Sequence, residues 1–321
     1  MRHILIALLI FTSFNSHAAA ATGKQTADSP EQFLFIRLGN GEKLSAEQLY
    51  KVIDSFYHES GNEKLANILS SSINVAMYLS TKGMAEESAN LLEKVIEKNQ
   101  SMIEHDFPYK RSLYGMVGIL HHTAGRYKEA SERLEQSLRY ASVNEADVGV
   151  KDEKIIIHLF TSYIELERCS EAHELIVEGL RNNMINVQVI FASELTLSHI
   201  AAMYDGLQQK GSALFFAKLA LIQTRSQSKQ GLTENDTVSL LSNFINHLQQ
   251  EVNDASSLSK ASDFIANGNT RHFMTDAEYV LYTRYDKIIT DAGQMSASYP
   301  AKLNSGQEMQ NLLLDIESTL K

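Results

Sequence analysis

The chain has few of the residues that interrupt or cross-link a fold. Among 321 residues there are 3 prolines, 16 glycines, 1 cysteine and no tryptophan. The single cysteine, Cys169, excludes an internal disulfide, so packing alone must hold the fold. Few helix breakers, together with frequent Leu, Ala, Ser and Glu, favour an all-helical protein. Sustained alternation of apolar and polar residues, the mark of strands, is not found.

Positive charge and long apolar runs are also scarce. Lys and Arg number 29 against 39 Asp and Glu, so the formal net charge is −10. This acidity argues against nucleic acid and anionic membrane surfaces as partners. The apolar run Ile4–Phe11 has eight residues, whereas a membrane-spanning helix needs roughly 20. No later run is long enough to cross a membrane.

That apolar run has the setting of a secretory signal. Arg2 and His3 precede it, and the small residues Ala18–Ala21 follow it as a cleavage site. No cysteine directly follows the cleavage site, so we expect no bacterial lipid anchor. Because disulfides are absent as well, we expect an exported protein, periplasmic or secreted, of bacterial type.

A fixed spacing of 42 residues organises the first half of the chain. Three sets of positions recur in step: Gly83, Gly125 and Glu167; Ser88, Ala130 and Ala172; Leu92, Leu134 and Ile176. A period between 20 and 50 residues is typical of stacked supersecondary units. The alternative is an irregular helical bundle in which the spacing is accidental.

The middle unit shows what each position does. Gly118 and Ala130 are small where two helices must approach closely, and Gly125 supplies the left-handed turn between them. The order of a large residue, a small residue, a turn glycine and an alanine resembles the tetratricopeptide repeat (TPR). A fourth, less regular unit contains Ile200, Met203, Tyr204, Gly211 and Ala220, and an imperfect extra unit lies at Gly61 and Ala66.

The predicted fold is an all-α, right-handed TPR-like solenoid with a helical C-terminal extension. Capping boxes at Ser45/Gln48 and Thr275/Glu278 predict two helix starts. Further helices are expected over 233–252 and 258–265, and a last one over 309–320 after a break at Tyr299-Pro300. The expected organisation is a signal peptide at 1–21, a lead and short helix at 22–45, repeats at 46–228 and the extension at 229–321.

Two stretches are similar to a narrower family. KGSALFFAKLALIQTRSQ, at 210–227, resembles the last repeat of exported bacterial TPR proteins that carry a CHAT domain, a caspase-like module. Residues 270–293 resemble the helical connector that leads to that module. The resemblance implies a His/Cys protease after the connector, but this chain ends at Lys321. What the resemblance implies for this chain is the sensing half of such a system without its catalytic half.

Catalytic chemistry is not indicated elsewhere. Cys169 and His173 are four residues apart on one helix face, but two ligands are too few for a metal site. His121 is expected to be a hydrogen-bonded core histidine. Metalloprotease, hydrolase, phosphate-loop and dinucleotide motifs are absent. The prediction is a protein that is not an enzyme and binds no cofactor and no metal.

The repeats point instead to a binding groove lined by the first helix of each hairpin. Its candidate residues are Ile73, Met77, Thr81, Ile119, His122, Thr123, Ile157, Thr161 and Ile164. This aliphatic and hydroxyl-rich set suits an amphipathic helix or apolar peptide better than a charged chain end. The predicted function is a protein- or peptide-binding scaffold of the periplasm.

Three alternatives remain open. The C-terminal helices fill the groove themselves; the chain regulates a separately encoded CHAT-type protease; or it is a structural subunit that self-associates.

Overall fold

The computed structural model describes residues 29–140, 152–228, 235–252, 264–265, 268–294 and 299–320. All regular structure in this part is helical, without a strand, which confirms the all-α class. The predicted signal peptide and most of the expected helix at 258–265 lie outside the described residues. Within the described part, no helix is both long and apolar enough to span a membrane.

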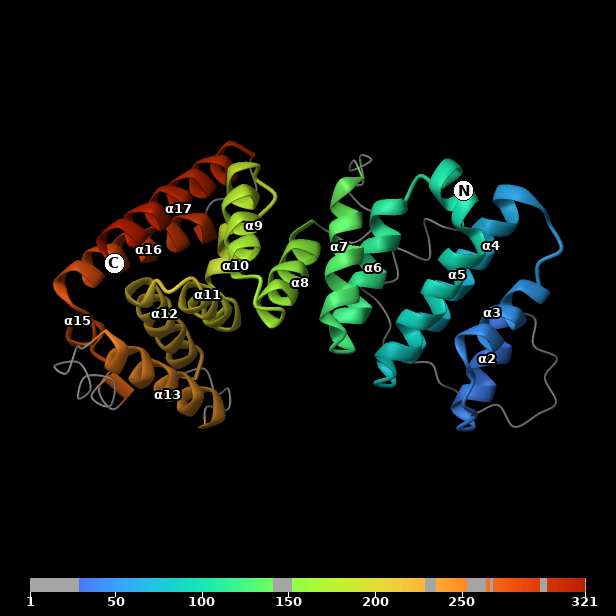
Figure 1. Ribbon diagram of the computed structural model, residues 1–321, viewed down its shortest axis with the longest axis horizontal. Helices are drawn as coiled ribbons and strands as arrows, with labels where there is room; N and C mark the ends of the chain where they lie inside the picture. The colour runs from blue at the N-terminus through green and yellow to red at the C-terminus, as the bar shows by residue number, and fades with distance from the viewer. Residues whose placement is uncertain are drawn as a thin grey trace. The chain divides into compact units, whose positions relative to one another are not determined.

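The chain forms two compact units, 1–158 and 159–321, with the boundary inside helix α8 (Asp152–Glu165). The helices of the first unit that precede α8 are α2 (Pro30–Gly39), α3 (Ala46–Ser55), α4 (Gly61–Thr81), α5 (Ala85–Asp106), α6 (Lys110–Thr123) and α7 (Tyr127–Arg139) (Figure 1). Those of the second are α9 (Cys169–Arg181), α10 (Val187–Phe191), α11 (Glu194–Gly206), α12 (Lys210–Ser228), α13 (Asn235–Glu251), α15 (Thr270–Phe273), α16 (Asp276–Gln294) and α17 (Tyr299–Thr319).

Six described turns between consecutive helices share one backbone pattern, those at Gly41 and Asn183 included. The four that join the hairpins of the predicted repeat each contain a residue in the left-handed region: Gly83 (φ +76°), Gly125 (+72°), Glu167 (+57°) and Gln208 (+60°). The next residue donates its N–H to the carbonyl five positions back: Met84 to Leu79, Arg126 to His121, Arg168 to Tyr163 and Gln209 to Tyr204, at 2.8–3.0 Å. This is the Schellman closure of a helix end. The turns recur at intervals of 42, 42 and 41 residues, so the predicted spacing corresponds to a real structural repeat.

The small positions of the repeat are equally regular. Five residues after each left-handed residue lie Ser88, Ala130, Ala172 and Ala213, all fully buried. In each hairpin the N–H of this residue bonds to the carbonyl four positions back, in the first turn of the second helix. A small residue is needed there because two helix backbones approach each other.

Several predicted boundaries are wrong. The fourth turn is at Gln208, and Gly211 instead lies inside α12, where a Cβ would collide with the Leu320 carbonyl. At the imperfect extra unit, Gly61 is in the left-handed region (φ +66°) where α4 begins, and Ala66, five residues later, is half-buried in α4. The last helix begins at Tyr299, since proline is tolerated in the first turn of a helix. Both predicted capping boxes are confirmed by their reciprocal hydrogen bonds.

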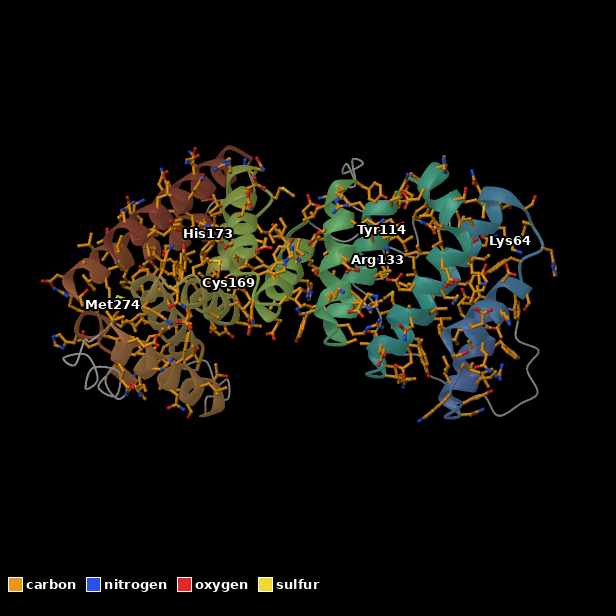
Figure 2. All side chains as sticks on the ribbon, viewed as in Figure 1. Lys64, Tyr114, Arg133, Cys169, His173 and Met274 are labelled. Atoms are coloured by element: carbon orange, nitrogen blue, oxygen red, sulfur yellow. The ribbon has the colours of Figure 1, made fainter. Side chains whose placement is uncertain are left out.

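Buried polar bonds join the helices of the first unit. The Arg111 side chain on α6 is 8 % exposed and donates to the Asp152 carboxylate at 2.6 and 3.0 Å and to the Tyr140 carbonyl at 2.6 Å. It therefore ties the end of α7 and the start of α8 to α6. Arg133 lies over the Tyr114 ring, 5.4 Å from its centre, between α7 and α6 (Figure 2).

In the second unit, the C-terminal helices fold back on the repeat helices. The α16–α17 pair lies against α9 and α10 (Figure 1). Glu317 of α17 accepts hydrogen bonds from His173 of α9 and Tyr204 of α11, each at 2.8 Å. The Tyr285 hydroxyl of α16 donates to the Phe191 carbonyl of α10. Residues 229–321, expected as a separate extension, thus share one packed unit with α9–α12.

Replacing Glu167 by glycine is expected to stabilise the second unit by about 0.5–1 kcal/mol, because glycine adopts the left-handed conformation without the steric cost of a Cβ. Glu167 is exposed, so the loss of its side chain removes no packing. Urea unfolding measures the change. Gly125→Ala is the reverse substitution at the equivalent position, and it should lower the free energy of unfolding of the first unit by about 1 kcal/mol. A destabilised Glu167→Gly variant would show that its left-handed conformation is not strained.

Candidate functional site

The predicted groove residues on α4 offer little free surface. Ile73 is 6 % exposed and belongs to the core of the first unit, and Met77 is half-buried and packs against that core. Thr81 is exposed at the end of α4, where its hydroxyl donates to the Tyr78 carbonyl at 2.7 Å. In this hairpin, only Thr81 of the three fully faces solvent.

The structure brings the candidates on α6 and α8 together. The rings of His122 and His158 are 4.6 Å apart, with their Nδ1 atoms at 3.2 Å, so the two helices are neighbours there. Burial, followed by the proximity of His122 and Lys154, lowers the pKa of His158 to about 4, and the ring is neutral at pH 7. Ile119 and Ile157 are half-buried on the same two helices.

The remaining candidates are half-buried or exposed. Thr123 is exposed and donates its hydroxyl hydrogen bond to the Ile119 carbonyl at 2.8 Å. Thr161 and Ile164, further along α8, are half-buried and belong to the second unit. The structure therefore unites Ile119, His122 and Ile157 in one region of the first unit.

His121, next to this region, is a core histidine as predicted. It is 1 % exposed, and its Nε2 atom lies 3.0 Å from the Glu93 carboxylate, which also accepts two bonds from Arg133 at 2.6 and 2.8 Å. Burial alone would raise the pKa of Glu93, but the bonds from His121 and Arg133 lower it to about 2. Because the folded-state pKa is depressed, this carboxylate stabilises the fold at neutral pH and loses that effect as the pH falls towards 2.

Cys169 and His173 do not form a reactive pair. Burial, followed by the nearby acids Glu167, Asp205 and Glu171, raises the pKa of the Cys169 thiol, which opposes its use as a nucleophile. His173 is bonded to Glu317 instead. Across the described ranges, no three His, Cys, Asp or Glu side chains gather in a way that could hold a metal ion.

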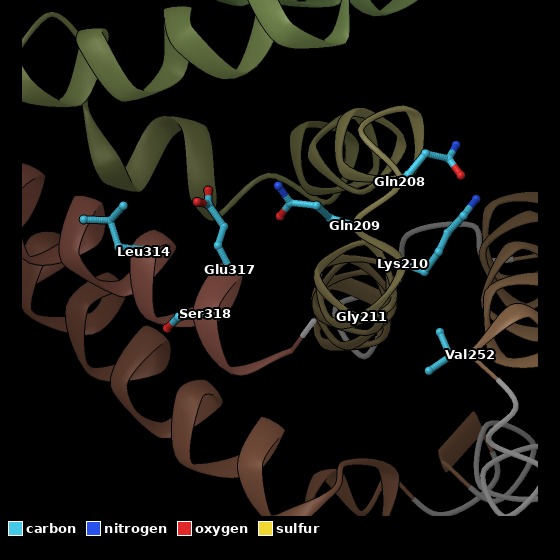
Figure 3. A pocket seen from close by; sticks show the side chains of 8 residues that line it. All are labelled: Gln208, Gln209, Lys210, Gly211, Val252, Leu314, Glu317 and Ser318. Atoms are coloured by element: carbon cyan, nitrogen blue, oxygen red, sulfur yellow. The ribbon is translucent and has the colours of Figure 1, made fainter.

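A pocket of about 630 Å³ lies wholly within the second unit. It is formed by the turn and first residues of α12, the end of α13 and the last turns of α17 (Figure 3). Its lining residues are Gln208, Gln209, Lys210, Gly211, Val252, Leu314, Glu317 and Ser318. A volume of this size is in the range of small-molecule sites, roughly 300–1,000 Å³.

Sequence reasoning missed most of this pocket. Gln208 and Gln209 belong to the fourth repeat, but Leu314 and Glu317 come from a helix more than 100 residues away along the chain. The apolar spacing on 309–320 predicted a helix and its buried face. It contained no information on which helices that face would meet.

Comparisons with known proteins identify no relative: no family model, no curated protein and no solved structure matches this chain.

Proposed function

We propose that this chain is a non-catalytic binding protein, built from TPR-like helix hairpins that stack as a right-handed solenoid. Its partner would be a protein or peptide of the bacterial periplasm, reached through an N-terminal signal peptide. The observation that carries the proposal is the fourfold recurrence of one hairpin turn at intervals of 41–42 residues. Repeats of this kind build extended surfaces for partners rather than enclosed reaction centres.

The region around Ile119, His122 and Ile157 is the proposed partner surface. Two half-buried isoleucines, beside the contact between His122 and the neutral His158, give an aliphatic and weakly polar patch where α6 and α8 meet. An amphipathic helix or apolar peptide could place its apolar side chains there and bury further area. The raised pKa of the Cys169 thiol supports a role without covalent catalysis.

Affinity capture from periplasmic extract tests this surface, with the chain lacking residues 1–21 as bait. We expect the double variant Ile119→Glu, Ile157→Glu to lose the captured partners, because two carboxylates would have to be desolvated on binding. Ile36→Glu is the matched control, since Ile36 is 49 % exposed in the same unit but lies on α2.

Equal capture by the double variant and the parent chain would show that the partner surface lies elsewhere. Circular dichroism and thermal unfolding must first show that both variants are folded. If glutamate lowers the melting temperature, the alanine pair Ile119→Ala, Ile157→Ala takes its place. Peptide hydrolysis that disappears in Cys169→Ala would overturn the non-catalytic part of the proposal.

A further inference from the structure

The pocket of the second unit contains hydrogen-bond acceptors whose capacity is not used. The Gln209 side-chain oxygen is buried and has no donor among the described residues. Glu317 accepts from His173 and Tyr204, but both bonds go to the same oxygen, Oε1. The two bonds fix the carboxylate in place and leave Oε2 to accept from something else. A buried acceptor without a donor is costly, and such groups often mark the place of a ligand.

The one cation among the described residues that line the pocket is already engaged. Lys210 Nζ bonds to the Asp205 carboxylate at 2.5 Å and to the Glu251 carboxylate at 2.8 Å. These bonds, that to Asp205 first, raise the pKa of Lys210 and keep it charged. Asp205 and Glu251 thus outnumber the ammonium group that they bond, and Glu317 adds a carboxylate elsewhere in the lining. Among the described lining residues, an anionic ligand would find no free positive charge, whereas a cation would be attracted.

The rest of the lining consists of two aliphatic residues, Leu314 and Val252, one glycine, and the polar residues Gln208 and Ser318. Leu314 and Val252 are 55 % and 41 % exposed, so both aliphatic side chains are available for contact. Gly211 has no room for a side chain, because the Leu320 carbonyl lies against it. Figure 3 shows Glu317 and Gln209 on one side of Gly211, with Lys210 and Val252 on the other. The pocket thus combines the acceptors of Glu317 and Gln209 with two aliphatic side chains.

We propose that this pocket binds a primary ammonium group on an aliphatic stem, with Glu317 and Gln209 accepting its N–H bonds and Leu314 contacting the stem. Two sources carry this chemistry: a free alkyl diamine, or the lysine side chain of a peptide. The site is independent of the Ile119–Ile157 surface, so either can fail without the other.

Isothermal titration of the chain lacking residues 1–21 tests the proposal with three probes: 1,5-diaminopentane, Nα-acetyl-lysine amide and neutral 1-pentanol. We expect saturable binding of at least one amine, weakened by added salt, and no binding of pentanol. Tighter binding of the diamine identifies free amines as the source, whereas tighter binding of the lysine amide identifies a peptide side chain. Absence of saturable binding by both amines, or equal binding of pentanol, would overturn the proposal.

Glu317→Gln is the decisive variant. The amide still accepts from His173 and Tyr204, so α17 stays in place, but the charge is lost and affinity should fall about tenfold or more, because hydrogen bonds to charged groups are the stronger ones. Glu308→Gln, exposed on the same helix, is the matched control and should change affinity less than twofold. Gln209→Met should weaken binding by about three- to tenfold by removing a neutral acceptor. Equal affinity in Glu317→Gln and Glu308→Gln would refute the assignment.

Discussion

Replacing Lys218 by methionine is expected to destabilise the second unit by about 3–5 kcal/mol, because it leaves a buried carboxylate without its counter-charge. Lys218 on α12 and Glu278 on α16 have side chains 1 % and 5 % exposed, and Nζ bonds to both carboxylate oxygens at 2.8 Å. The ammonium group also lies over the Phe273 ring, 5.6 Å from its centre. Urea unfolding, followed by circular dichroism, measures the loss.

A second substitution tests whether the lost stability comes from the unpaired charge or from the changed packing. Glu278→Gln removes the buried negative charge, while the amide oxygen still caps the Thr275 N–H at the start of α16. The double variant Lys218→Met, Glu278→Gln should therefore recover to within about 1–2 kcal/mol of the parent chain. Lys287→Met, an exposed lysine on α16, is the control and should change stability by less than about 0.5 kcal/mol. A double variant no more stable than Lys218→Met would show that the charge is not the cause.

The local features of the fold were predictable because their causes are local. Two hairpins are marked by glycine, at 83 and 125, and by a small residue five positions later. The 42-residue spacing extends this pattern to position 167, where the residue is Glu instead of glycine. The capping box at Thr275 likewise depends on residues three apart. Each of these signals reflects a backbone requirement that a few neighbouring residues meet.

The features that depend on distant contacts were not predictable in this way. Gln208 has no preference that reveals its left-handed conformation, and Gly211, the glycine that the pattern assigned to the fourth unit, instead lies inside α12 against the Leu320 carbonyl. The bond between His173 and Glu317 joins residues 144 positions apart. Amphipathic spacing shows which face of a helix is buried but not which helix covers it. The pocket was missed for the same reason.

At Gly118, helix α6 lies close to the backbone of α7. A Cβ on Gly118 would lie 2.5 Å from Leu134 Cγ and 3.1 Å from the Leu134 backbone nitrogen. The side chain could move, but the nitrogen belongs to the backbone of α7, so the two helices would have to separate. Gly118→Ala should therefore destabilise the first unit by about 2–3 kcal/mol, a cost of overpacking that exceeds the gain in helix propensity of about 1 kcal/mol.

The control for this prediction is the same substitution at a glycine with room around it. At Gly39, the last residue of α2, a Cβ would meet only the Tyr78 hydroxyl at 3.6 Å, an ordinary contact, so Gly39→Ala should be neutral or slightly stabilising. Combining Gly118→Ala with Leu134→Ala relieves part of the clash, and the double variant should lose less stability than the sum of the two single changes. Strict additivity would mean that the spacing of α6 and α7 is not set by the contact between Gly118 and Leu134.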